Sequence, residues 1–168
     1  HRPELYERLK AKHQVIAHAE VSPNLAFRFV PANWQYNKTL IIIDSDSLST
    51  YACLQSQSHE AWVRLLASSF KDDLRYTASV CFKTFPFPKE WEATLNLENA
   101  GREYYQFRAK LMVCNNEGLT KTYNRFHDPE DKSPDILKLR ELHAAMDRAV
   151  LDAYGWTDVP TDCEFIPD

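Results

Sequence analysis

The pattern of apolar and polar residues in the first quarter of the chain is typical of short strands. Strands are predicted over residues 14–21, which are rich in β-branched and small residues, over residues 25–30, which alternate, and over residues 39–43. In the second of these, Phe27 and Phe29 face one side and Arg28 faces the other. The third is apolar throughout, so we expect it to be buried on both faces. A short helix is predicted before the strands, from Pro3 to about Lys12, because Pro and Glu favour a first helical turn.

Helical spacing begins after the third strand. Residues 44–50 supply turn and N-cap chemistry, and the helix is expected to run to about Ser68. Its predicted apolar stripe consists of Tyr51, Leu54, Ser58, Ala61 and Leu65. Val80–Phe85 is predicted to form another strand, which Pro86 and Pro88 end.

The second half of the chain has helical periodicity. Between Trp91 and Cys114, apolar residues recur at alternating spacings of four and three, at Ala100, Tyr104, Phe107, Leu111 and Cys114. A last helix is predicted to begin at Ser133 as N-cap with Pro134 in its first turn, and to end at Gly155. Its stripe is Ile136, Leu139, His143, Met146, Val150 and Ala153. Two such helices should pack as an antiparallel pair.

These elements predict an α+β fold class, in two parts. Residues 1–88 are expected to form a small mixed β-sheet with a packed helix, and residues 89–168 an antiparallel helical hairpin. A chain of 168 residues with 44% apolar residues can bury one core, so we expect one domain or one domain with a helical appendage. The chain opens on His1 rather than Met and is therefore expected to be a piece of a longer protein.

Composition narrows the class of protein. No apolar run approaches the roughly 18 residues of a membrane span, and no secretory signal is visible. The four cysteines are far apart and form no CxxC pair, which argues against a zinc knuckle or a disulfide framework. Reduced thiols, and hence a cytoplasmic location without membrane association, are expected.

Charge is divided unevenly along the chain. Residues 1–88 carry ten Lys and Arg against eight Asp and Glu, whereas residues 89–168 carry ten against sixteen. A polyanion would be repelled by the second part, so any contact with nucleic acid is expected before Pro88.

Several kinds of active site are not indicated. None of the three glycines belongs to a phosphate-cradling loop, so no cofactor is expected to bind this chain. Glu130-Asp131-Lys132 resembles part of a metal-dependent nuclease motif, but the Pro-Asp pair comes after it instead of preceding it. A solvated turn is the better interpretation. His59 and Glu60 are adjacent on a predicted helix and cannot face the same partner, so they are not interpreted as a catalytic pair.

Three separated motifs occur in order within the first part. They are LxSxxHxxWxR at residues 54–64, KxDxRYT at residues 71–77 and TFPFP at residues 84–88. Farther on come Asn116–Pro129 and a segment from Leu142 to Trp156. This succession resembles the target-recognition region and C-terminal part of large adenine-specific DNA methyltransferases of the Type IIG restriction–modification kind and of related phage-defence systems.

The resemblance implies a function that this chain performs only as part of a larger enzyme. In that family a methyltransferase core, which binds S-adenosylmethionine and carries the catalytic motif, lies upstream. An enzyme that methylates adenine N6 must extrude the base from the duplex, so it needs a second lobe that grips double-stranded DNA and reads its sequence. We therefore expect this chain to position duplex DNA for an upstream core. The chain itself is not expected to be an enzyme.

Candidate DNA contacts are the protruding polar and basic side chains of the first part. They are Arg28, Asn33, Gln35, Asn37, Lys38, Arg64, Lys71, Arg75 and Tyr76. Residues 33–38 are expected to form a loop or a hairpin tip, which suits base reading, and the alternative is an ordinary polar turn with Trp34 and Tyr36 folded back onto the sheet. Each candidate also has a structural interpretation: Arg64 can pair with Asp72 or Asp73, and Arg75 and Tyr76 can form a packed corner.

Two weaker candidates, Lys121 and Arg125, lie in the second part. The segment from Thr120 to Arg125 is better interpreted as a connector that braces the helices. The competing hypothesis for the whole chain is a protein–protein docking module whose helical hairpin binds a partner subunit. Salt-dependent binding of duplex DNA separates the two hypotheses.

Overall fold

β1 (Gln14–Ala19) is the central strand of a three-stranded antiparallel sheet in the computed structural model, which describes residues 3–66, 68–70 and 73–161. β3 (Arg28–Pro31) and β4 (Leu40–Ile43) pair with its two edges in the order β3-β1-β4. Residues 15–18 of β1 are all buried. From the sequence, burial on both faces was predicted for the strand at residues 39–43 and not for β1. That prediction was wrong, because β4 is an edge strand in which only Ile43 is buried.

A second small sheet continues from the first. β2 (Val21–Ser22), β6 (Asp73–Arg75) and β5 (Ser68–Phe70) pair antiparallel in the order β2-β6-β5. Glu20 connects the two sheets, since its amide donates to the carbonyl of Thr39 at 2.7 Å and its carbonyl accepts from the amide of Tyr76 at 2.8 Å. The predicted strand over residues 14–21 therefore divides at Glu20. β5 and β6 were not predicted from the sequence.

The helix predicted to run to about Ser68 is in fact two helices, α2 (Leu48–Gln55) and α3 (Gln57–Leu66), which come after the first sheet. A separate short helix, α1 (Pro3–Leu9), precedes the sheet. Ser47 caps α2 by accepting a hydrogen bond from the amide of Thr50 at 3.2 Å. Ser56 is extended and breaks the helix, which changes the helical phase of the residues after it. His59 and Val63 face the core in α3, whereas Leu65 of the predicted stripe is 76% exposed.

The prediction of a strand over Val80–Phe85 was also wrong. Thr77 precedes a short helix, α4 (Ala78–Cys81), and the amide of Cys81 donates to the carbonyl of Thr77 at 2.7 Å. Cys81 and Phe85 are both buried. Their spacing of four fits a helical turn as well as it fits a short strand, so the pattern did not separate the two conformations.

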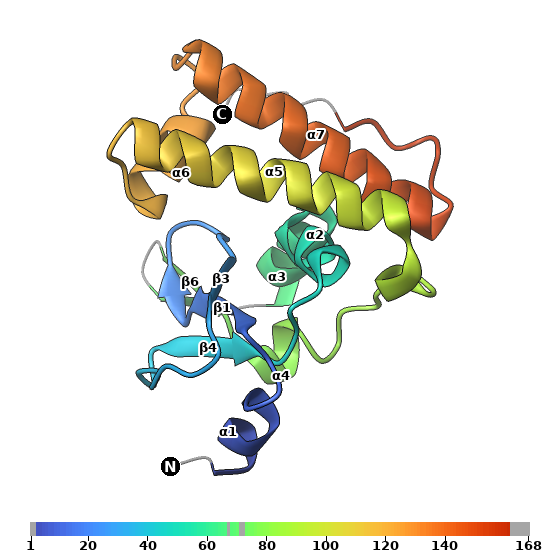
Figure 1. Ribbon diagram of the computed structural model, residues 1–168. Helices are drawn as coiled ribbons and strands as arrows, with labels where there is room; N and C mark the ends of the chain where they lie inside the picture. The colour runs from blue at the N-terminus through green and yellow to red at the C-terminus, as the bar shows by residue number, and fades with distance from the viewer. Residues whose placement is uncertain (1–2, 67, 71–72, 162–168) are drawn as a thin grey trace.

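The second part of the chain is helical, as predicted. The 3-10 turn η1 (Trp91–Ala93) leads into α5 (Leu95–Cys114), then α6 (Leu119–His127) and α7 (Pro134–Tyr154). In Figure 1, α5 and α7 run side by side in opposite directions above α2, and the first sheet lies below. The left-handed Gly155 ends α7, as the sequence indicated. None of the helices in the part of the chain that the structure describes is long and apolar enough to cross a membrane.

Both parts contribute to one hydrophobic core. Ile16 and Phe27 of the sheet side belong to the same buried cluster as Tyr104 of α5 and Ile136 of α7. α5 approaches α2 so closely at Gly101 that a Cβ there would lie 2.5 Å from the carbonyl oxygen of Leu48. The α+β class is confirmed, and the division into residues 1–88 and 89–168 stays a prediction.

Candidate nucleic-acid interface

Arg28 projects from the start of β3 into solvent. Its neighbour Phe27 is fully buried, so the alternation that the sequence predicted at this point is confirmed. Two buried side chains hold the backbone of Phe27. Its amide donates to Oε1 of Gln55 at 2.9 Å, and its carbonyl accepts from Nη2 of Arg108 at 2.6 Å. Gln55 also donates to the carbonyl of Leu25 at 2.9 Å. The backbone that carries Arg28 is therefore fixed from behind.

Arg108 of α5 is 2% exposed and lies among tyrosine rings. Its guanidinium carbon is 5.5 to 5.7 Å from the centroids of four rings, those of Tyr51, Tyr104, Tyr105 and Tyr123. Its Nη1 donates to the hydroxyl of Tyr123 at 2.7 Å. Aromatic faces attract a cation, and this attraction is strongest where water is excluded. The sequence pattern did not indicate Arg108, since the predicted apolar stripe of α5 passed through Phe107.

The segment from Asn33 to Lys38 connects β3 to β4, and it is not the tip of a hairpin. The two strands it joins lie on opposite sides of β1 and do not pair with each other. Asn33, Gln35, Asn37 and Lys38 are nevertheless exposed. Tyr36 folds back and its hydroxyl donates to the carbonyl of Pro31, whereas Trp34 is 58% exposed. The segment thus presents amide side chains to solvent from a connection between edge strands.

The basic candidates near the second sheet form ion pairs at the surface. Arg64 pairs with Glu60 one turn earlier in α3, with Nη2 at 2.6 Å from Oε1, and Arg75 pairs with Glu20 at 3.0 Å. Lys71 and the partners suggested for Arg64, Asp72 and the side chain of Asp73, lie outside what the structure describes. Exposed ion pairs of this kind contribute about 0–1 kcal/mol. They therefore leave both arginines available to an anion.

Tyr76 is a core residue. It is fully buried, and its hydroxyl lies 3.1 Å from Nε2 of His59. His18, Phe27 and His59 pack around it at ring distances between 5.3 and 5.8 Å. Burial holds the pKa of His18 at about 4 and that of His59 at about 3, so both imidazoles are neutral. This geometry favours the packing role for Tyr76 that the sequence left open.

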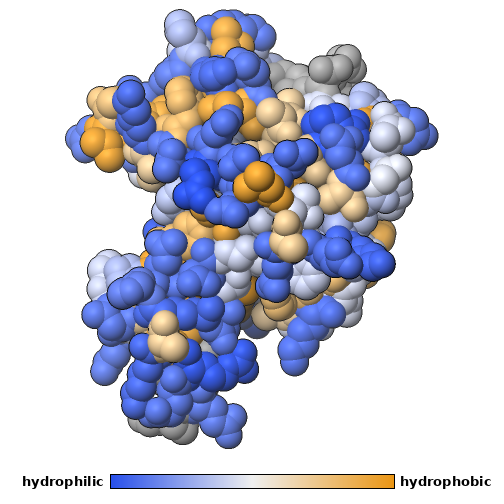
Figure 2. All heavy atoms as spheres, turned by 45° about the vertical axis from the view of Figure 1, so that its right-hand side comes forward, coloured by the Kyte–Doolittle hydropathy of each residue, from blue (hydrophilic) through white to orange (hydrophobic). Residues whose placement is uncertain are grey.

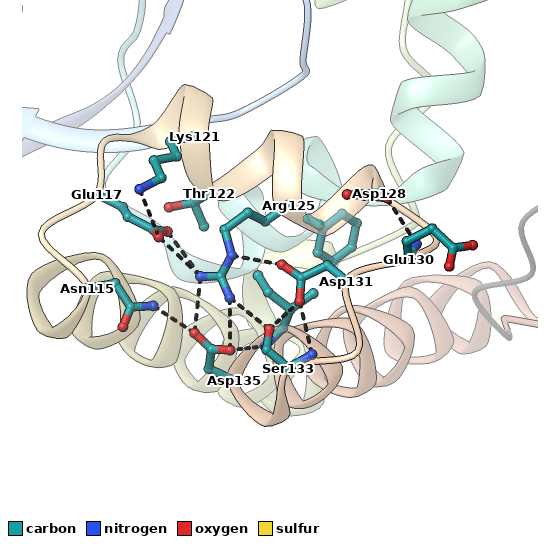
Figure 3. Close-up of polar contacts among 12 residues, drawn as sticks. Asn115, Glu117, Lys121, Thr122, Arg125, Asp128, Glu130, Asp131, Ser133 and Asp135 are labelled. Atoms are coloured by element: carbon teal, nitrogen blue, oxygen red, sulfur yellow. Dashed lines mark hydrogen bonds and ion pairs between the residues drawn. The ribbon is translucent and has the colours of Figure 1, made fainter.

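Arg125 is the centre of an ionic network at the end of the helical part (Figure 3). Its guanidinium contacts Asp131 at 2.8 Å, Asp135 at 3.1 Å and Glu117 at 3.2 Å. Hydrogen bonds to Asp135 and Asp131 raise the pKa of Arg125 above its ordinary value. The network ties α6 to the loop before α7 and to the first turn of α7. Arg125 is thus engaged within the chain, as expected for a connector.

Lys121 belongs to the edge of the same network and is freer than Arg125. Its side chain is 68% exposed, and its Nζ lies 3.6 Å from the carboxylate of Glu117.

No group of three or more His, Cys, Asp or Glu residues among those described has an arrangement that could hold a metal ion.

The surface differs in character between the two parts of the molecule. Figure 2 shows mainly hydrophilic side chains over the lobe that carries α1 and the first sheet, while apolar side chains are interspersed over the helices. The exposed apolar residues of the long helices include Leu95, Val113 and Leu137. The polar surface coincides with the part for which the sequence predicted DNA contacts.

Comparisons with known proteins agree with this arrangement. The chain is similar to DNA methyltransferase A of Bacillus subtilis (strain 168), with 28% identity over 129 residues, which are 76% of this chain and 13% of that protein. The solved structure of the Type IIL restriction-modification enzyme MmeI in complex with DNA matches with a TM-score of 0.70 at 24% identity, over 88% of this chain and 19% of that chain. This likeness establishes the fold. The chain spans less than a fifth of the length of either protein.

A family model identifies the first part of the chain directly. The model described as "MmeI, target recognition domain" matches residues 2–89, which is more than half of the chain. These residues include the first sheet, the exposed segment from Asn33 to Lys38 and the basic residues up to Arg75. The chain belongs to the MmeI target recognition domain family.

Proposed function

We propose that this chain is the target-recognition module of a larger, site-specific adenine-N6 DNA methyltransferase. In this proposal it binds duplex DNA and presents it to a methyltransferase core of the same protein, which lies outside the 168 residues. The family match over residues 2–89 carries the proposal. A role in restriction–modification or phage defence and a cytoplasmic location are parts of it.

S-adenosylmethionine belongs to the proposed core and not to this chain. A cofactor loop needs glycines at a strand-to-helix turn, and the glycines here lie elsewhere. Gly101 is inside α5, Gly118 precedes α6 and Gly155 ends α7. The residues of the chain therefore do not fit that cofactor. Its own part is to bind, orient and read the duplex.

The physical demands of base flipping support this division of labour. Extruding a base costs a few kcal/mol of stacking and pairing, so the rest of the duplex must be held while the base leaves. Contacts to phosphates fix the position of the protein on the DNA, and contacts to base edges select the sequence. We assign phosphate contact to Arg28, Arg64, Lys71 and Arg75. The exposed amides of Asn33, Gln35 and Asn37, beside Lys38, are assigned to base edges.

The test is salt-dependent binding of duplex DNA by the chain and by the full-length protein that contains it. Each phosphate neutralised should contribute about −0.9 to the slope of log K against log salt. Reversing Lys71 and Arg75 together to Glu should weaken binding to every sequence and flatten the slope by about two units. Lys110→Glu, an exposed change on α5, is the control and should change the slope little.

Two outcomes would argue against the proposal. If neither protein binds duplex DNA in a salt-dependent way, although both are folded, the chain does not recognise DNA. A protein-docking module is then the better hypothesis, and the exposed Leu95 and Val113 of α5 favour it. In that case Val113→Ser should weaken association with a partner subunit and leave DNA binding absent.

A further inference from the structure

We propose that the cleft between β3 and the helical part binds a phosphodiester group of the DNA backbone, with Arg28 as the contacting residue and Arg108 as the positioning residue. The proposal rests on the proposed function, which already assigns Arg28 to a phosphate, and adds to it the cleft as the site of that contact and a positioning role for Arg108. It gives the helical part a role in DNA binding, although the sequence placed all strong candidates before Pro88.

Two adjoining depressions form this cleft, and they share Arg28 and Leu119. One is lined by Phe29, Tyr105, Arg108, Met112 and Asn116, among others. The other is lined by residues between His18 and Ala26 and by Thr120 at the start of α6. The lining thus combines the sheet with α5 and α6. A ligand in the cleft would touch both parts of the chain.

Arg28 differs from the other exposed arginines that the structure describes in its lack of an internal partner. Within the part of the chain that the structure describes, its side chain forms no ion pair and no hydrogen bond. The arginines that do pair with a carboxylate at the surface are Arg8, Arg64, Arg75, Arg102 and Arg148. An exposed guanidinium without a partner keeps its full capacity for a bidentate contact to an anion.

The charge of the cleft is positive. Glu117 is the carboxylate in its lining, and Lys121 and Arg125 both pair with it, at 3.6 and 3.2 Å. Arg108 lies at the inner wall without a carboxylate partner among the described residues, since its hydrogen bonds go to uncharged groups. One cation at the rim and another behind it therefore favour an anionic ligand.

Arg28 is held in place before any ligand arrives. The backbone of Phe27 is bonded on both sides, to Gln55 and to Arg108, and Arg28 itself pairs with Ala17 of β1. A side chain on a fixed backbone loses less entropy on binding than one on a mobile loop. Arg108 acts through this backbone and does not itself need to reach the ligand.

A backbone phosphate suits this site better than a base edge. The exposed segment from Asn33 to Lys38 begins beyond the other end of β3, roughly 10 Å away at about 3.3 Å per residue. Amides at that end can read bases, while a single guanidinium at the near end fixes the register of the duplex. Binding of DNA at both ends of β3 would use one rigid element for both tasks.

The first experiment compares salt dependence in Arg28→Ala, Arg28→Lys and the control Lys110→Ala. Loss of one phosphate contact should reduce the slope of log K against log salt by about 0.9 in Arg28→Ala. Arg28→Lys keeps the charge and should keep the slope, and Lys110→Ala should resemble the wild type. An unchanged slope in Arg28→Ala, with wild-type binding intact, would overturn the site while the proposed function stands. Absence of salt-dependent binding by the wild type would instead defeat the proposed function.

The second experiment identifies the ligand group. Duplexes in which one phosphate at a time is replaced by a neutral methylphosphonate are titrated with the wild type and with Arg28→Ala. At one backbone position the substitution should weaken the wild type several-fold and leave Arg28→Ala unaffected. Equal profiles for the two proteins would show that Arg28 does not contact a phosphate.

The role of Arg108 is tested through Arg28. Arg108→Lys keeps the cation but loses the planar fork that reaches Phe27, Gln55 and Tyr123 together. If Arg108 positions Arg28, the effects of Arg108→Lys and Arg28→Ala on the salt slope should be less than additive. Additive effects, or an Arg108→Lys protein with a normal slope, would remove Arg108 from the site. Should Arg108→Lys fail to fold, the methylphosphonate profiles still decide whether Arg28 binds a phosphate.

Discussion

Arg108 of α5 donates a 2.6 Å hydrogen bond to the carbonyl oxygen of Phe27, across 81 residues of sequence. This bond joins the helical part of the chain to the strand that carries Arg28. Tyr123 of α6 accepts from the same guanidinium, so three elements meet at one buried cation. The two parts that the sequence separates at residue 88 are therefore energetically connected at this point.

Arg108→Ala should destabilise the chain strongly. It leaves the carbonyl of Phe27 and the hydroxyl of Tyr123 without this partner and opens a cavity among four tyrosine rings. Each buried group left without its hydrogen bond costs about 1–3 kcal/mol, to which the cavity adds. Urea unfolding monitored by circular dichroism measures the change. Arg102→Ala on the exposed face of the same helix, which breaks only the surface pair with Glu98, should cost less than about 1 kcal/mol.

Gly101→Ala should destabilise the chain even though Ala is the better helix former. In an open helix this exchange gains about 1 kcal/mol. Here the new Cβ would lie 2.5 Å from the carbonyl oxygen of Leu48 and 3.2 Å from Cβ of Ala52, so α5 must move away from α2. A lower melting temperature is the expected result. Gly118→Ala is the control, because no atom lies within 4 Å of the added Cβ. A melting temperature raised by Gly101→Ala would show that the two helices pack less closely.

Stability should fall as the pH is lowered below about 6.5. Burial lowers the pKa of His18 to about 4 and that of His59 to about 3, so the folded state holds both imidazoles neutral while the unfolded chain protonates them. The stability that the two neutral imidazoles contribute is fully present above the pKa of an unfolded histidine. It is lost as the pH falls from that value towards the lower pKa of the folded state. Between the unfolded pKa of about 6.5 and its folded pKa, each histidine should lower the free energy of unfolding by about 1.4 kcal/mol per pH unit.

The measurement for this pH dependence is the free energy of unfolding at a series of pH values. His59→Gln should reduce its slope between pH 6 and pH 4 by about 1.4 kcal/mol per pH unit, since one group that is neutral in the folded state and protonated in the unfolded state is removed. His13→Gln changes an exposed histidine and should leave the slope as it is. If His59→Gln retained the full slope, the acid sensitivity would arise elsewhere.

Arg125→Ala should lower stability and leave the salt slope of DNA binding unchanged, although the loss of its ion pair with Glu117 in the cleft should weaken the affinity itself. Without the guanidinium, Glu117, Asp131 and Asp135 lose their shared partner and repel one another. We expect a loss of roughly 2 kcal/mol in urea unfolding. The salt slope of duplex binding should stay at its wild-type value, because Arg125 is already engaged within the chain. A slope reduced by about one unit would assign Arg125 to a phosphate instead.

Periodicity found the long helices but could not set the phase of each one. In α5 the predicted stripe and the observed buried residues share Tyr104 and Leu111, and both sets have spacings of four and three. The observed set includes Gly101 and Arg108, residue types that a hydrophobicity pattern passes over. In α3 the phase changed because Ser56 interrupts the helix, and a serine inside a helical pattern does not by itself indicate a break.

The pairing of strands that are distant in the sequence could not be predicted, for a different reason. The three strands of the first sheet were predicted from residue type and from the apolar pattern, but the order β3-β1-β4 depends on which edges meet in space. The sequence left a loop and a hairpin tip open for residues 33–38, and the structure has the loop, because adjacent strands in sequence do not have to be neighbours in a sheet. Alternation did establish that Arg28 faces away from Phe27 and Phe29, since that relationship depends only on the period of a single strand.

Gln35→Ala, in the full-length protein, should relax one position of the recognised DNA sequence. The amide of Gln35 is exposed on the connection between β3 and β4, and a glutamine amide can match the N6 and N7 atoms of adenine in the major groove. Loss of one such bidentate contact should remove about 1–3 kcal/mol of discrimination against the other bases. Mapping of methylated adenines across the genome of cells that carry the variant measures this directly. Gln106→Ala, an exposed glutamine on α5, is the matched control and should leave the recognised sequence unchanged. If the Gln35 variant methylates the same sites to the same extent as the wild type, this segment does not read bases through Gln35, and its exposed amides serve only the connection between the strands.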